Sequence, residues 1–269
     1  MTYVLAAFLG VVQGLTEFLP ISSTAHLLIG GQLLGHEDPG GVFTTMIQLG
    51  SILSVMWLYR RKLLGVVVGL PSDPEARRFA LMLLVGCVPV LVAGALFGDV
   101  IQRQLYGGYG APRVIAGTFI VGGAVMLLAE RWRPAPAVWS AERTPLGRAL
   151  GVGLCQTLAL IPGVSRSGAT VVGGMLMGLD RPAAAELSFF LSMPTMTAAF
   201  AYGLLKLRGQ VGPERGVEIL VGFIFAGLAA LVVVRPFLRY VGRSGFAIFA
   251  WYRIVAGLAL LAAIAAGWA

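Results

Sequence analysis

The stretch QGLTEFLPISSTAH, residues 13–26, lies between apolar segments yet contains a carboxylate, an imidazole and a run of hydroxyls. Residues 3–19 are compatible with a helix that Pro20 interrupts, because proline has no amide N–H and its ring clashes with the preceding turn. The segment that follows, residues 23–35, is too short to cross about 30 Å of hydrocarbon at about 1.5 Å per residue. The stretch therefore predicts a re-entrant hairpin, in which one helix enters the membrane, a polar turn reverses the chain, and a second helix leaves.

The composition around this hairpin is that of a membrane protein. The chain of 269 residues is 58% hydrophobic and only 12% charged, with a mean hydropathy of +0.86. A soluble domain of this size would need more charge to cover its surface, whereas long apolar runs with almost no charge are typical of transmembrane helices. We therefore predict an all-α polytopic membrane protein. The predicted spans are 42–59, 79–97, 114–129, 187–205, 217–234 and 246–268.

A second polar hairpin divides the chain into two similar halves. Residues 147–161 predict a helix, PGVSRSGAT (162–170) a polar turn, and 169–179 a short helix. Three spans follow each hairpin, which predicts one membrane domain over 1–269 built from repeats of roughly 1–132 and 140–269. A hairpin returns to its own side and three crossings reverse the chain, so the second hairpin enters from the opposite face. This arrangement is an inverted-topology repeat.

The distribution of basic residues predicts which side each loop occupies. The net charge is +8, but thirteen of the twenty Lys and Arg residues lie in loops 60–78, 130–148, 180–183 and 235–243. Cytoplasmic loops carry such an excess, so we expect both termini outside, the first hairpin entering from the exterior, and no nucleic-acid partner.

The polar residues of the first hairpin suggest a functional site. Gln13 and Glu17 are four residues apart and share a helix face. Ser22 and Ser23 lie at the turn, and His26 falls one helical turn further on. The serines could simply cap a helix while His26 binds a neighbouring carbonyl. An ionisable group at membrane depth, however, costs about 2.5–3.5 kcal/mol even on insertion scales, so Glu17 is interpreted as part of a site.

The second hairpin has the chemistry of a phosphate site. Glycines let backbone N–H groups approach an anion, hydroxyls add donors, and the following helix directs its positive end toward the ligand. The planar fork of Arg166 can bind two phosphate oxygens at once. The alternative is a simple Gly/Ser turn whose arginine reaches toward the membrane interface.

The two stretches resemble the signature motifs of the bacterial undecaprenyl-diphosphate phosphatase family, the bacitracin-resistance type of integral membrane phosphatase. The resemblance extends along the chain through IQLGSI (47–52), ELSFFLSMP (186–194) and WYRI (251–254). Many relatives carry glutamate where this chain has Gln13. The resemblance implies hydrolysis of undecaprenyl diphosphate to undecaprenyl phosphate and phosphate in the bacterial cytoplasmic membrane, which recycles the lipid carrier of cell-wall synthesis. The site would then face the exterior.

The resemblance also implies roles for individual residues. The catalytic residues that it implies are Glu17, Ser23, His26 and Arg166. The expected substrate-binding residues are Gln13, Ser22, Thr24, Gln48, Gly163, Ser165, Ser167 and Gly168. It further implies a divalent cation, Mg²⁺ or Ca²⁺, that Glu17 would hold together with the diphosphate. The partners expected are the polyprenyl diphosphate lipid and the bilayer, and a homodimer is compatible with this reading.

Two questions stay open from the sequence. In our mechanistic hypothesis Ser23 attacks the terminal phosphorus with His26 as base and later acid. His26 itself, or a water activated by Glu17, fits the same spacing. The alternative function is a flippase of a polyprenyl phosphate lipid, since inverted repeats with broken helices are also transporter architecture.

Overall fold

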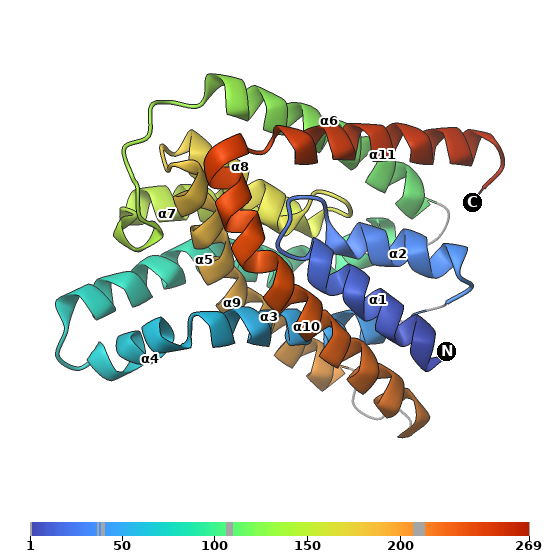
Figure 1. Ribbon diagram of the computed structural model, residues 1–269, viewed down its shortest axis with the longest axis horizontal. Helices are drawn as coiled ribbons and strands as arrows, with labels where there is room; N and C mark the ends of the chain where they lie inside the picture. Colours follow the sequence, from blue (N-terminus) through green and yellow to red (C-terminus); the bar gives the residue numbers. More distant parts are fainter. Residues whose placement is uncertain (1, 37, 39–40, 106–109, 207–212, 269) are drawn as a thin grey trace.

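The computed structural model describes residues 2–36, 38, 41–105, 110–206 and 213–268 (Figure 1). These residues form helices and connecting segments, without a β-strand among them, which confirms the predicted all-α class. The elements are, in chain order, α1 (Tyr3–Thr16), α2 (Ser23–Leu33), α3 (Val42–Leu58), α4 (Arg60–Gly69), α5 (Pro74–Leu105), α6 (Ala111–Trp132), η3 (Ala141–Arg143), α7 (Leu146–Thr157), η4 (Leu158–Leu160), α8 (Arg166–Leu176), α9 (Arg181–Lys206), α10 (Pro213–Ser244) and α11 (Ala247–Ala265).

All six predicted spans correspond to helices. The helices α5, α6, α9, α10 and α11 are each long and apolar enough to cross a membrane. The sixth is the pair α3 and α4, which passes the same test together but is bent by 75°. The chain is therefore a multi-pass membrane protein.

Three segments expected as loops are largely helical instead. The expected loop 60–78 contains α4 and the beginning of α5, the expected loop 180–183 contains the beginning of α9, and the expected loop 235–243 lies in the end of α10. Their arginines and lysines mark where a helix leaves the hydrocarbon, but these residues are good helix formers and do not end it. The loop between α10 and α11 is correspondingly short and turns at Gly245, which has a φ of 70°.

Both predicted hairpins are present. The first is α1, a turn over residues 17–22, and α2, and the second is α7, η4, a turn over 161–165, and α8. The second short helix begins at Arg166 rather than near residue 169, because Ser165 caps it by accepting a hydrogen bond from Gly168 N at 3.1 Å.

The hairpins are held inside the bundle by helices of the other half. The helix α1 packs along α10, and α7 packs along α5. The approach is close because glycines face backbone: a Cβ on Gly14 would meet the carbonyl of Ala226, and one on Gly153 would meet that of Gly86. Small residues allow such contact between membrane helices. Figure 1 shows the result, with α1 alongside α10 and the paired α6 and α11 above α1 and α2.

An aromatic core fixes the first turn against α9. Phe18 is fully buried and packs edge-on against Phe189, with ring centroids 5.2 Å apart. Phe189 also contacts Phe237 of α10. Because Phe18 follows Glu17 directly, burial of the ring sets the position of the carboxylate.

Candidate active site

The carboxylate of Glu17 is the centre of a buried hydrogen-bond network. Its Oε2 accepts from Gln13 Nε2 at 2.7 Å and from Ser23 Oγ at 2.6 Å. Gln13 reaches it from one turn earlier on α1, and Ser23 from the first residue of α2. Less than a tenth of the surface of each of these residues is exposed. The first hairpin thus presents a hydroxyl already bonded to a carboxylate.

Arg166 connects this network to the second hairpin. Its Nη2 donates to Glu17 Oε1 at 3.0 Å, and its Nη1 donates to the main-chain oxygen of Ser188 on α9 at 3.1 Å. Ser188 also accepts a hydrogen bond from Thr170 of α8. The first residue of α8 is therefore held from two sides, and its charge lies against Glu17. The snorkelling alternative is not the arrangement seen.

The residues before the two short helices share an unusual backbone conformation. Ser22 and Ser165 both have a φ of 68°, and they are the non-glycine residues with positive φ among those described. Such positions cost about 1–3 kcal/mol and are common at functional sites. In both hairpins this bend turns the chain so that the next helix begins with its amide end toward the site.

A cavity of about 100 Å³ lies where the hairpins meet. Its lining residues are Glu17, Ser22, Ser23, Thr24, Gln48, Ala159, Ile161, Gly163, Ser165, Arg166 and Met196. Eight of them are residues predicted to act on or bind the substrate. Most of the lining is polar, and its apolar members are Ala159, Ile161 and Met196.

Four predicted residues lie outside this lining. Gln13 is behind Glu17, and its Oε1 is buried without a hydrogen-bond partner. Ser167 donates to Leu19 O at 2.8 Å and bonds with Ser165 Oγ at 3.1 Å, so it joins the two turns. The N–H of Gly168 is used by the Ser165 cap. The fourth residue is His26.

His26 does not contact Ser23 in the way the mechanistic hypothesis expected. Its Nδ1 lies 2.7 Å from Ser22 O, so this nitrogen carries the proton, and its Nε2 lies 2.6 Å from Tyr252 Oη, which therefore donates. The rings of His26 and Tyr252 stack at 5.7 Å. His26 follows Ser23 by three residues on α2, and its imidazole points toward α11 and away from the Ser23 hydroxyl.

Sequence reasoning assigned no role to several residues that hold the site together. Tyr252 and Arg253 of α11, Thr118 of α6 and Ser188 of α9 all bond to the hairpins. The sequence held a signal for Tyr252 and Arg253. Both belong to WYRI, which is part of the family resemblance, and Arg253 is also a charge inside an apolar run. Thr118 and Ser188 are isolated hydroxyls that no pattern distinguishes.

The donor set suits a hard cation only if the ligand supplies part of it. The described residues contain no group of three His, Cys, Asp or Glu side chains that could hold a metal. Mg²⁺ and Ca²⁺ prefer oxygen ligands, and the carboxylate of Glu17 and the hydroxyl of Ser23 are such ligands at the cavity. A cation here would need its other oxygen ligands from the bound molecule or from water.

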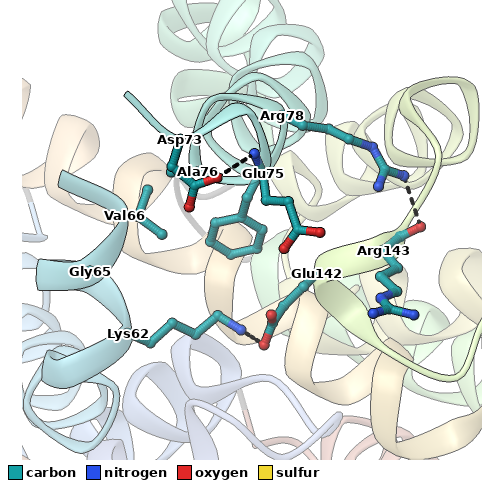
Figure 2. A pocket seen from close by; sticks show the side chains of 10 residues that line it. Lys62, Gly65, Val66, Asp73, Glu75, Ala76, Arg78, Glu142 and Arg143 are labelled. Atoms are coloured by element: carbon teal, nitrogen blue, oxygen red, sulfur yellow. Dashed lines mark hydrogen bonds and ion pairs between the residues drawn. The ribbon is translucent and has the colours of Figure 1, made fainter. Parts of the chain in front are cut away.

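A second pocket has a different character (Figure 2). It measures about 250 Å³ and lies between α4, the beginning of α5 and η3. Lys62 forms an ion pair with Glu142 across it, and Arg78 Nη2 donates to Arg143 O at 3.3 Å. Carboxylates and cations balance each other here, and none of the predicted site residues lines it.

Comparison with known proteins identifies the family of the chain. The chain matches the family described as bacitracin resistance protein BacA over residues 6–259. It is 47% identical over 265 residues to the undecaprenyl-diphosphatase of Paracoccus denitrificans, covering 98% of each chain. It is 47% identical over 267 residues to that of Cereibacter sphaeroides, covering 99% of this chain and 98% of the relative. It is 49% identical over 259 residues to undecaprenyl-diphosphatase 2 of Rhodospirillum rubrum, covering 96% and 93%.

Proposed function

This chain belongs to the bacitracin resistance protein BacA family, and from that we propose that it is an enzyme that hydrolyses undecaprenyl diphosphate to undecaprenyl phosphate and inorganic phosphate. The observation that carries the proposal is the convergence of Ser23, Glu17 and Arg166 at one cavity. A hydroxyl bonded to a carboxylate can be activated, and the arginine beside it can neutralise a phosphoryl group.

We propose Ser23 as the nucleophile. Its Oγ attacks the terminal phosphorus while its proton passes to Glu17, to which it is already bonded at 2.6 Å. The bond between that phosphorus and the bridging oxygen breaks, undecaprenyl phosphate leaves, and a phosphoserine forms. Glu17 thus takes the role of base that the sequence suggested for His26. A base must lie within hydrogen-bonding distance of the proton it removes, and Glu17 lies at that distance from Ser23 Oγ.

The second step restores the enzyme. The proton that Glu17 took from Ser23 leaves with undecaprenyl phosphate, so that Glu17 is a carboxylate again. A water then attacks the phosphoserine, and Glu17 accepts one proton of that water. It passes this proton to Ser23 Oγ as the bond between phosphorus and Oγ breaks and inorganic phosphate leaves.

Arg166 and the start of α8 stabilise the charge that is transferred. In phosphoryl transfer the protein contributes mainly by positioning and electrostatics. Arg166 lies at the amide end of α8, where the helix dipole also favours an anion. With Ser165 and Gly163 lining the same cavity, hydroxyl and backbone donors stand beside the guanidinium.

His26 acts through the turn in this scheme. Its proton is donated to Ser22 O, and Tyr252 fixes its tautomer. We propose that it holds Ser22 in its positive-φ conformation and thereby aims Ser23. His26, predicted from the sequence as a catalytic residue, is a positioning residue in this proposal.

A divalent cation is proposed as a cofactor. Glu17, which lines the cavity, would hold it together with phosphate oxygens, and when bound it would offset negative charge on the diphosphate. The apolar lining residues Ala159, Ile161 and Met196 would contact the first isoprene units of the lipid.

We also propose the inverted repeat and the orientation. Support comes from the reciprocal packing of α1 on α10 and α7 on α5, and from the matching φ values of Ser22 and Ser165. In Figure 1 the beginning of α1 and the end of α11 lie on the right, whereas α4, which begins with Arg60, Arg61 and Lys62, lies on the left. With the basic end in the cytoplasm of a bacterial cell, both termini and the first hairpin face outside. The homodimer stays a prediction.

The function is tested by phosphate release from undecaprenyl diphosphate by the purified protein in detergent micelles, with and without a chelator. Micelles have no second compartment, so a carrier would release nothing. No observation favours the transport alternative over the enzyme. Phosphate release that requires a divalent cation is the expected result, and absence of release by the folded protein would contradict the proposal.

A further inference from the structure

Arg253 is a buried charge that the mechanism above leaves unused. It lies in α11, a membrane span, and only 1% of its surface is exposed. It does not line the cavity. A charge at membrane depth is costly to keep and usually marks a function.

Its hydrogen bonds all go to main-chain oxygens near the site. Nη1 donates to Val164 O at 2.9 Å and to Pro20 O at 3.3 Å. Nη2 donates to Gly163 O at 3.0 Å and to Thr118 O at 2.8 Å. One guanidinium therefore binds the turn of the first hairpin, the turn of the second, and α6. Carbonyls in such turns lack helical donors and need a partner when buried.

These carbonyls lie next to the residues that carry the chemistry. Pro20 precedes Ser23 by three residues, and Val164 precedes Arg166 by two. Because both oxygens share the same nitrogen of Arg253, a shift of either turn changes the distance between the nucleophile and the phosphate-binding arginine. Thr118 Oγ1 reinforces the second turn by donating to Pro162 O at 2.8 Å.

We propose, resting on the proposed function, that Arg253 is a positioning residue that sets the separation of the two hairpin turns, so that Ser23 and Arg166 act on the same phosphoryl group. The planar fork is required because two nitrogens must each serve two acceptors in fixed directions. A lysine ammonium carries the same charge but cannot reproduce this geometry. A displacement of about 1 Å at reacting atoms can cost a factor of about 10² in rate.

Two variants test this without removing the charge. Arg253→Lys keeps the charge and loses the fork. Gly122→Ala keeps Arg253 itself but pushes on it, since a Cβ at Gly122 would lie 2.9 Å from Arg253 Cζ. The matched control is Gly117→Ala on the same helix, where an added Cβ meets nothing within 4 Å. Each is purified in micelles and assayed for undecaprenyl diphosphate hydrolysis and thermal unfolding.

The expected result is a loss of kcat of about tenfold or more in Gly122→Ala and about 10²-fold in Arg253→Lys, with KM within about threefold of wild type. Gly117→Ala should match wild type. The losses from Arg253→Lys and Arg166→Lys should be less than multiplicative when combined, because both act on the same contact with the phosphoryl group. A purely structural arginine would instead give multiplicative losses that follow the folded fraction.

The outcomes separate this inference from the function it rests on. Wild type that releases no phosphate contradicts the proposed function. Active wild type together with Gly122→Ala and Arg253→Lys near wild-type kcat contradicts the role of Arg253 alone. Gly122→Ala that fails to fold beside a folded Gly117→Ala makes Arg253 a part of the fold and also overturns the proposal.

Discussion

Glu17 and Arg166 are 149 residues apart in the chain and meet in a buried ion pair, with Arg166 Nη2 3.0 Å from Glu17 Oε1. One comes from the end of α1 and the other from the beginning of α8, so neither hairpin is a complete site. The pair also keeps two charges at membrane depth mutually compensated, where each alone would be costly.

The first prediction separates charge from geometry at Arg166. Arg166→Lys should remain folded but lose a factor on the order of 10²–10³ in kcat, since an ammonium cannot make two parallel hydrogen bonds to phosphate. KM should change less, because the isoprenoid tail supplies most of the ground-state binding. Steady-state phosphate release at equal protein concentration measures both. Activity within a few-fold of wild type would make Arg166 a counter-charge only.

The second prediction concerns the cation. A chelator should abolish activity, and Gln13→Glu should lower the Mg²⁺ concentration needed for half-maximal activity, because it replaces the amide that donates to Glu17 with a second carboxylate. At saturating Mg²⁺ its kcat should lie within a few-fold of wild type. Gln13→Ala is the matched control and should need more cation. A Gln13→Glu variant that needs more Mg²⁺ than wild type would contradict a cation held at Glu17.

The third prediction uses the strained backbone of Ser165. Ser165→Gly and Ser165→Ala both lose the hydroxyl that caps α8, but only alanine has a Cβ that opposes a φ of 68°. Ser165→Gly should therefore be more stable than Ser165→Ala by about 1 kcal/mol. Thermal unfolding of both in the same detergent measures the difference. Equal stability, or the reverse order, would show that the positive φ is not maintained.

The fourth prediction concerns orientation. In a chain with Cys87 and Cys155 replaced by alanine, a cysteine at Leu34 should react with an impermeant thiol reagent added to intact cells. A cysteine at Trp139 should react only after the cells are opened. Both positions are well exposed, at 49% and 71%. The reverse pattern would place the first hairpin on the cytoplasmic side.

Much of the fold could be predicted because a membrane imposes simple rules. Apolar runs gave the spans, and Pro20 with the short segment after it gave the first hairpin. What the sequence did not predict were helix ends. Segments 60–69 and 235–243 are basic, and charge shows where a helix leaves the hydrocarbon but not where it stops.

The sequence predicted which residues belong to the site better than it predicted where their side chains point. The motifs and the family resemblance named eight of the cavity's lining residues, including Gln48 from IQLGSI. They could not show that His26 turns toward Tyr252, because that depends on how α11 packs beside α2. Nor could spacing show that one guanidinium, on Arg253, joins two turns that are far apart in sequence.

The most direct test of the central claim follows a label in the substrate. Undecaprenyl diphosphate labelled at its terminal phosphorus is incubated in detergent micelles with Mg²⁺ and either wild type or Glu17→Gln, which keeps the size of the side chain and removes its charge. The account predicts that wild type moves the label into inorganic phosphate and leaves unlabelled undecaprenyl phosphate. Folded Glu17→Gln should be slower by a factor of about 10² or more, because it loses the proton acceptor of Ser23. Label that stays in the lipid with wild type, or equal release by both proteins, would contradict it.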